Sequence, residues 1–287
     1  MKNYVFGDTG GHLKQLYASL RAIGVDPTNG TMPKDVRVIH LGDLIHKGPH
    51  SSLLLEQIDK LIRNNPGQWI QILGNHEFQH IEGSPYFWKC DCNKVDVAII
   101  NEWHEQGLAT PTFGIDSYIE ESIVLGLSKR DDIPRPKTGM FFSHAGLSWE
   151  WWAGFEKLTK PSELSDMLNS ISVSFITTPG EMLGVYGRKP GPVWAIGNSE
   201  VFDGWTSHAD TMPFLQMHGH TTSYNWMSNK WWRNDRDFQH FRNSTKLNPE
   251  TRAVITKMSG NLLIGIDPGY SKNPTSKEQP YVYFETK

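Results

Sequence analysis

The amino-acid sequence predicts an α/β fold built on mixed β-sheets. Apolar segments of strand length alternate with amphipathic helical segments early in the chain, and this alternation is typical of parallel strands joined by helices. Towards the C-terminus, "AVITKM" and "LLIGID" are separated only by "SGN", a turn signal that predicts an antiparallel hairpin. Because both strand relationships are expected in one chain, we expect mixed sheets.

The early part of the chain supplies three strands and three helices in alternation. The first helix carries apolar residues at helical spacing, and Ser51 and Ser52 are candidate N-cap residues of the second. The expected strands are 4–6, 36–41 and 69–73, and the expected helices are 12–23, 51–64 and 94–106.

The remainder of the chain is expected to contain more strands than helices. We expect a loop at 129–139, a helix at 163–173 and a last strand at 281–285. Further strands are expected at 140–143, 213–217, 253–258 and 262–267. Since no internal repeat or linker divides the sequence, we expect a single domain over residues 1–287.

Two segments stand out by their aromatic content. Tryptophans gather at about 149–205, which we interpret as an insert or lid, and aromatic and basic residues alternate in a second expected insert at about 225–246. Such interleaving can stack bases while binding phosphates. We favour instead a hydrophobic lid packed on the sheets with a solvated basic edge. The stacking alternative is the best indication that a substrate carries a base.

Composition narrows the class of protein. A hydrophobic content of 38% and a net charge of −3 are typical of a soluble globular protein and do not point to nucleic acid or an anionic membrane. Cys90 and Cys92 are too few for a disulfide framework, so we interpret them as thiols, with a metal site as the alternative. No run approaches the ~18 apolar residues of a membrane span. We therefore expect a reduced, cytoplasmic protein with no membrane partner.

Polar residues follow the expected strands at their carboxyl ends, usually beside glycine. In open α/β sheets this edge is where ligands bind, because the strand ends and loops converge there. Aspartate, asparagine and histidine together suit divalent metal ions. Each residue also has an ordinary structural explanation, but the recurrence at six strand ends favours a metal cluster. The six residues are Asp8, Asp43, Asn75, His144, His220 and Asp267.

The order of motifs "GD…GD…GNHE…HAG…HGH" resembles the calcineurin-like metallophosphoesterases, and within them the phosphoprotein-phosphatase branch, which also includes bacterial dinucleotide phosphatases. "GDLIHKGPHS" followed by "LGNHE" is the most specific part. The resemblance implies two mixed β-sheets packed as a sandwich flanked by helices, a four-layer arrangement with two metal ions at one edge.

Site roles follow from the resemblance, motif by motif. Asp8 is expected on the first metal, and Asp43 is expected to bridge both. His76 is the expected general acid for the leaving oxygen. The two ions are expected to be Mn²⁺, with Fe or Zn²⁺ as alternatives, and to activate a bridging hydroxide. The expected ligands of the second metal are Asn75, His144 and His220.

The first motif departs from the family pattern Gly-Asp-x-His-Gly. Gly10 stands where the family has a histidine ligand, and the nearest imidazole is His12. The glycine pair Gly10–Gly11 can adopt backbone angles that fold His12 back over Asp8. We include His12 among the expected metal ligands, with a solvent-facing residue at the helix start as the alternative.

The second motif departs as well, in "GDLIHKG". Lys47 replaces an arginine that binds phosphate, so a bidentate fork becomes a point charge. His46 replaces an aspartate that orients the general acid, and an imidazole stabilises an imidazolium less well than a carboxylate does. Arg188, in "GVYGRKPG", is a further candidate for phosphate binding. Lys47, Arg188 and His46 are thus the expected substrate contacts.

The predicted function is hydrolysis of a phosphate ester on a phosphoprotein, a nucleotide or a small molecule. Thr222 follows the last motif where diesterases of the family often carry histidine, which favours monoesters. One alternative is a phosphodiesterase acting on cyclic nucleotides, dinucleotides or nucleic acid. The other is a weakened scaffold that binds phosphate without turnover, suggested by the departures at positions 10 and 46.

Overall fold

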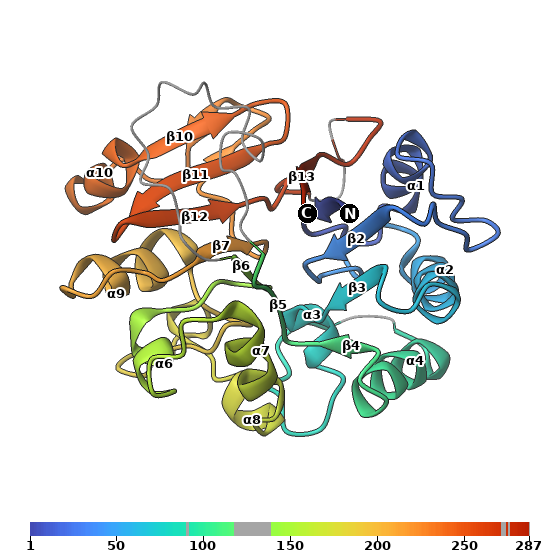
Figure 1. The fold of residues 1–287 in the computed structure, drawn as a ribbon, viewed down its shortest axis with the longest axis horizontal. Coiled ribbons are helices and arrows are strands. Elements are labelled where there is room, and N and C mark those ends of the chain that lie inside the picture. The colour runs from blue at the N-terminus through green and yellow to red at the C-terminus, as the bar shows by residue number, and fades with distance from the viewer. Residues whose placement is uncertain (90–91, 118–138, 271–273, 275, 287) are drawn as a thin grey trace.

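The computed structural model describes residues 1–89, 92–117, 139–270, 274 and 276–286. Two large mixed sheets face each other, with helices on their outer sides (Figure 1). The expected four-layer α/β architecture is therefore confirmed. Cys90 and most of the loop expected at 129–139 lie outside the described residues.

The first sheet has the strand order β13-β1-β2-β3-β4. Strands β1 to β4 run parallel, and β13 closes the sheet antiparallel to β1. The chain termini meet here, because β1 and β13 pair along their whole length (Figure 1). The bounds are Lys2–Phe6 for β1, Val36–His40 for β2, Trp69–Ile72 for β3, Ala109–Thr110 for β4 and Tyr281–Glu285 for β13.

The second sheet has the order β10-β11-β12-β7-β6-β5. Its centre is parallel, β12 to β7 and β7 to β6, and both flanks are antiparallel. The bounds are Thr112–Ile115 for β5, Met140–Ser143 for β6, Leu215–His218 for β7, Thr245–Asn248 for β10, Ala253–Met258 for β11 and Asn261–Gly265 for β12. A separate small hairpin joins β8, Tyr224–Asn225, to β9, Lys230–Trp231.

Helices cover the outer face of each sheet. On the first sheet these are α1 (Leu13–Ala22), α2 (Ser51–Asn64) and α4 (Lys94–Glu105), with the short α3 (Asn75–Phe78) following β3 (Figure 1). The helices packed on the second sheet are shorter. They are α6 (Trp149–Ala153), α7 (Pro161–Asn169), α8 (Val173–Ile176), α9 (Phe202–Thr206) and α10 (Arg236–Asn243), with a 3-10 turn at Glu181–Leu183 and a π turn at Gly197–Val201.

Three apolar clusters hold these layers together. The central one lies between the sheets and contains side chains from both, among them Val5, Ile39, Phe142 and Met217. A second cluster packs α1, α2 and α4 on the first sheet. The third packs the shorter helices on the second sheet. Burial between all four layers fixes the positions of the strand ends relative to one another.

Some expected elements differ in detail. The helix expected at 163–173 ends at Asn169, because Ser170 and Ile171 donate backbone hydrogen bonds three residues back and close the turn. Neither Ser51 nor Ser52 is the N-cap of α2; His50 is. Ser51 Oγ instead accepts the N–H of His46 at 2.9 Å, and Ser52 Oγ donates to Asp96 at 2.8 Å.

The tryptophans of 149–205 are mostly inside the protein. Trp151, Trp152 and Trp205 are buried in the cluster of the second sheet. In the segment 225–246, Trp231 packs partly against the same cluster, whereas Trp232 is 61% exposed. This burial favours packing over base stacking, and the assignment of the two segments as inserts remains our proposal. No helix in the described part of the chain is both long and apolar enough to cross a membrane.

Candidate metal centre

Five strand ends from both sheets meet at one buried point. Asp8 follows β1, Asp43 follows β2, Asn75 opens α3 after β3, His144 follows β6 and His220 follows β7. Ligand atoms of Asp8, Asp43 and His144 all lie within 4.8 Å of one another. The structure therefore brings these predicted residues together at the sheet edge where ligands of such folds bind.

The glycines of the motifs make room for the carboxylates. A Cβ on Gly74 would lie 2.3 Å from Oδ1 of Asp43, and one on Gly219 would lie 2.2 Å from Oδ1 of Asp8. Both distances are far below van der Waals contact. The glycines thus let the backbone of neighbouring strand ends approach the two aspartates closely.

Asn75, His144 and His220 form what we call the imidazole side of the centre. His144 Nδ1 donates to the carbonyl of Leu41 at 2.7 Å, and burial lowers the pKa of His144, so its Nε2 carries a lone pair. That Nε2 faces Asn75 Oδ1 at 3.0 Å and Asp43 Oδ1 at 3.3 Å. Electron-pair donors that converge in this way repel one another, and a cation among them removes the repulsion.

His220 completes this side. Its Nδ1 lies 3.1 Å from His144 Nε2, and burial lowers its pKa well below the ordinary value. Its Nε2 is buried and has no hydrogen-bond partner among the described residues. Since a buried polar atom without a partner is costly, the donor set fits a bound divalent ion.

Asp8, Asp267 and Lys47 form the carboxylate side. Asp8 Oδ1 accepts the N–H of His220 at 2.9 Å, while its buried Oδ2 has no partner within the described ranges. Burial, reinforced by Asp267 and Asp43, raises the pKa of Asp8. Positive charge stabilises carboxylates that lie so close together. Like the imidazole side, the carboxylate side therefore fits a bound cation.

Lys47 already supplies one positive charge there. Its Nζ lies 3.7 Å from Asp43 Oδ2. Burial opposes the charged form, but Asp43, Asp8 and Asp267 together outweigh it and raise the pKa of Lys47. The side chain stays 26% exposed, so it can also reach a ligand from solvent.

The first-motif loop is tied to the second-motif loop. Gly10 and Gly11 adopt left-handed backbone angles, φ 54° and 77°, which glycine reaches without strain. The N–H of Gly10 donates to the Asp43 carbonyl at 2.7 Å. A Cβ on Gly10 would lie 3.4 Å from Cδ of Lys47, so the lysine stem occupies space beside the position where the family has histidine.

His12 does not face solvent, so that alternative is wrong. It is 4% exposed and precedes α1, and its ring packs edge-on against Tyr270 with centroids 5.5 Å apart. Its role as a metal ligand stays a prediction.

His76 lies between the centre and His46. Its Nε2 is 3.6 Å from Asp43 Oδ2, and its Nδ1 is 2.5 Å from Nδ1 of His46. Burial lowers the pKa of His76 to about 4, despite the opposing charge of Asp43. The rings of Phe87 and Trp88 pack edge-on against it. The geometry places an imidazole within reach of a group bound beside Asp43.

Glu77 holds the second-motif loop, a role that sequence reasoning did not assign. Its buried carboxylate accepts N–H groups of Asp43 and Leu44, both at 2.8 Å, and of Gly74 at 2.9 Å. Glu77 therefore positions Asp43, the expected bridging ligand. Its place in "GNHE", one residue after the expected general acid, was the available signal.

A second support lies under Asp8. The N–H of Gly42 donates to His40 Nδ1 at 3.2 Å, so the proton of the neutral ring is on Nε2, 2.7 Å from Thr9 Oγ1. Thr9 donates in turn to Gln279 Oε1 at 2.8 Å. This buried chain fixes the loop that carries Asp8.

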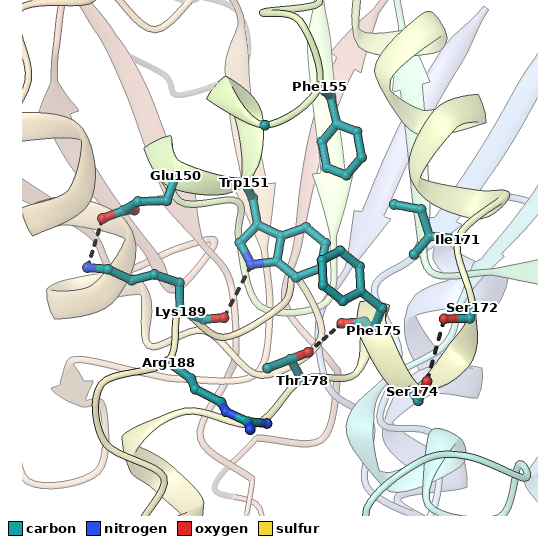
Figure 2. A pocket seen from close by; sticks show the side chains of 11 residues that line it. Glu150, Trp151, Phe155, Ile171, Ser172, Ser174, Phe175, Thr178, Arg188 and Lys189 are labelled. Atoms are coloured by element: carbon teal, nitrogen blue, oxygen red, sulfur yellow. Dashed lines mark hydrogen bonds and ion pairs between the residues drawn. The ribbon is translucent and has the colours of Figure 1, made fainter.

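Arg188 lies elsewhere, at the edge of an apolar pocket (Figure 2). The pocket has a volume of about 750 Å³, and the rings of Trp151 and Phe175 lie in it with centroids 4.9 Å apart. Arg188 is exposed and neighbours Lys189, which pairs with Glu150 at 2.7 Å. Phosphate binding by Arg188 remains a prediction.

Three solved structures similar to this chain are phosphatases of low sequence identity. A cold-active protein tyrosine phosphatase is 15% identical, with 93% of this chain and 70% of that chain covered and a TM-score of 0.49. One from a psychrophilic Shewanella species is 16% identical, with 92% and 80% covered and a TM-score of 0.45. A protein serine/threonine phosphatase from Saccharomyces cerevisiae is 11% identical, with 100% and 80% covered and a TM-score of 0.46.

Sequence comparisons give the family directly. No curated protein matches the chain. Residues 1–261, however, match the calcineurin-like phosphoesterases. This match includes Asp8, Asp43, Asn75, His144 and His220, whereas Asp267 lies beyond it. The chain belongs to the calcineurin-like phosphoesterase family and is a phosphoesterase.

Proposed function

We propose that this phosphoesterase hydrolyses phosphate monoesters with two divalent metal ions bound at the centre. The observation that carries the proposal is the convergence of three electron-pair donors. Asn75 Oδ1 lies 3.0 Å and Asp43 Oδ1 lies 3.3 Å from His144 Nε2. With His144 Nδ1 donating to Leu41, none of these three atoms supplies a proton to the others, and a metal ion among them would remove their repulsion.

The ligands divide between the two sides, with Asp43 between them. Asn75, His144 and His220 would hold one ion, and Asp8 would hold the other, with His12 as a further candidate. Mixed oxygen and imidazole ligands suit Mn²⁺ first, with Fe and Zn²⁺ as alternatives. When bound, the ions supply positive charge to the phosphoryl oxygens and activate the attacking water.

Lys47 and His76 would act on the substrate itself. The Lys47 ammonium faces the centre and also lines a cleft of about 450 Å³ together with His46, Lys89 and Trp88. Two lysines at this cleft suit an anionic ester, and Lys47 would contact a phosphate oxygen as a point charge. His76 Nε2 would deliver a proton to the leaving oxygen.

Phosphate monoesters on protein, nucleotides or small molecules remain the proposed substrates. Thr222 donates through Oγ1 to the carbonyl of Tyr224 at 2.8 Å and offers no imidazole for a diester. The low cysteine content and net charge of −3 support our proposal of a reducing, cytoplasmic setting without a nucleic-acid partner.

The test is metal removal and restoration. Chelation should abolish hydrolysis of an aryl phosphate, and Mn²⁺ should restore it, with a bis-aryl phosphate turned over far more slowly. Undiminished turnover after chelation would disprove the metal requirement. Faster turnover of the diester would favour the phosphodiesterase alternative, and full metal occupancy without any turnover would favour the scaffold.

A further inference from the structure

A second cluster of metal-binding side chains lies beside the centre. Ligand atoms of His46, His80 and Cys92 all lie within 4.8 Å of one another. Cys92 Sγ is 3.3 Å from His46 Nε2, and the rings of His46 and His80 have centroids 5.7 Å apart. The three residues come from separate segments, the loop after β2, the turn after α3 and the chain before α4. The fold, and not local sequence, brings them together.

The donor atoms of this cluster differ in kind from those of the centre. The centre offers carboxylate, amide and imidazole donors, whereas the cluster offers two imidazoles and a sulfur. Thiolate with imidazole is the ligand set of zinc, which binds three protein ligands plus an exchangeable fourth ligand at its open sites.

The cluster is also reachable by an ion. His46 is buried, whereas His80 and Cys92 are half-buried. His46 and Cys92 both line the cleft that contains Lys47. An ion could therefore enter from solvent and keep one position open towards the cleft.

We propose that His46, His80 and Cys92 bind a transition-metal ion, Zn²⁺ in the first instance, at a site separate from the phosphoesterase centre. Binding would take the proton from the Cys92 thiol and release it to solvent. The imidazoles would bind through neutral nitrogens, with Nε2 of His46 as the atom that faces the sulfur.

Occupancy of this site would fix the proton positions on His76. An ion on His46 Nε2 requires the ring proton on Nδ1, which lies 2.5 Å from His76 Nδ1 and would donate to it. His76 would then carry its own proton on Nε2, the nitrogen 3.6 Å from Asp43 Oδ2. His46 would thus be a positioning residue, and the site would replace the orienting carboxylate that the family has at position 46.

The test measures cobalt binding to the full chain after chelation. A cobalt–thiolate bond gives a charge-transfer band in the near ultraviolet that carboxylate and imidazole ligands do not give. We expect this band in the parent protein, its loss in Cys92→Ser, and about tenfold weaker Co²⁺ binding, read from the same band, in His80→Ala. His240→Ala, which removes an exposed imidazole on α10, is the matched control and should keep the band.

A second measurement covers the case in which Cys92→Ser does not fold. Zn²⁺ should slow alkylation of Cys92 by iodoacetamide about tenfold in the parent chain and not in His80→Ala, as read from the modified peptide by mass spectrometry. Absence of the band, a band that survives Cys92→Ser, or alkylation unaffected by Zn²⁺ would each overturn the site. Neither measurement involves turnover, so such a failure would leave the proposed hydrolysis untouched.

Discussion

The imidazole side and the carboxylate side of the centre differ in the positive charge that the protein itself supplies. On the imidazole side, neutral lone pairs converge, and no lysine or arginine among the described residues hydrogen-bonds His144 or Asn75. On the carboxylate side, the Lys47 ammonium already lies 3.7 Å from Asp43. An ion on the first side would meet no competing ammonium, whereas an ion on the second would share the carboxylates with a lysine. We therefore expect two ions of unequal affinity.

The largest effect is expected at the residue shared by both sides. Asp43→Asn removes a charge from both ions and should lower hydrolysis of an aryl phosphate roughly 10³-fold at saturating Mn²⁺. Asp8→Asn touches one side and should cost less. Residual activity and metal content of both variants are the measurements, and a worse Asp8→Asn would contradict the bridging role.

The sequence could predict this centre because its ligands follow a local rule. Each predicted ligand but His12 stands at the end of an apolar strand, in most cases beside glycine, and the carboxyl ends of strands are where ligands bind in such sheets. The supports of Asp8 obey no such rule. Thr9 and Gln279 are 270 positions apart and hydrogen-bond only because β13 returns to pair with β1.

Elements escaped prediction for a related reason. The strand β4 has two residues and α10 reads "RDFQHFRN", so neither carries a period long enough to recognise. The cluster of His46, His80 and Cys92 spans loops of different length and shows no metal-binding spacing in the sequence. These two elements and the cluster all depend on tertiary packing.

Protonation offers a test of how the carboxylate side is supported. Burial lowers the pKa of His40 to about 3, so native His40 stays neutral while the unfolded chain takes up a proton below about pH 6.5. Its stabilising contribution is therefore complete above that pH and declines as the pH falls. The difference in unfolding free energy between the parent and His40→Gln should shrink by about 1.4 kcal/mol per pH unit below 6.5.

Urea unfolding of the chelated proteins at several pH values measures this difference. Slopes from other groups cancel in the subtraction. A difference that stays constant from pH 7 to 5 would show that His40 titrates normally and does not hold the loop of Asp8 as a neutral ring.

The close approach of Gly219 to Asp8 predicts that a larger side chain at this position lowers stability and metal binding. In Gly219→Ala the new Cβ would lie 2.2 Å from Asp8 Oδ1 and displace it. We expect a loss of about 1–3 kcal/mol in the free energy of unfolding and weaker metal binding on the carboxylate side. Gly154→Ala, whose Cβ would lie 3.3 Å from its nearest neighbour at a helical φ of −68°, is the matched control. Equal effects of the two variants would refute the steric argument.

Removing the lysine charge should reduce the difference in ion affinity between the two sides. Lys47→Met keeps an aliphatic stem over Gly10 but removes the ammonium beside Asp8 and Asp43. A metal ion then no longer competes for these carboxylates, so the weaker Mn²⁺ equivalent should bind about tenfold more tightly. The value of kcat/KM should fall, because a phosphate contact is lost. Lys47→Arg should retain or improve activity, since a planar fork suits two phosphate oxygens. Isothermal titration calorimetry with Mn²⁺ measures the affinity. Unchanged affinity in Lys47→Met would show that the ammonium does not compete with the ion.

The smallest effect is expected at His12, the one predicted ligand that stands away from the strand ends. Its ring is buried against Tyr270, so His12→Ala should cost about 1–3 kcal/mol of unfolding free energy through lost packing. If the imidazole also binds metal, the carboxylate-side equivalent should bind more weakly while the equivalent held by Asn75, His144 and His220 does not change. Tyr270→Leu separates the two roles, because it disturbs the same packing without removing a nitrogen donor. We expect both variants to lower stability, and His12→Ala alone to weaken the carboxylate-side Mn²⁺, by less than about tenfold because Asp8 and Asp43 remain. Identical Mn²⁺ binding in the two variants would remove His12 from the ligands and leave the carboxylate side to its aspartates.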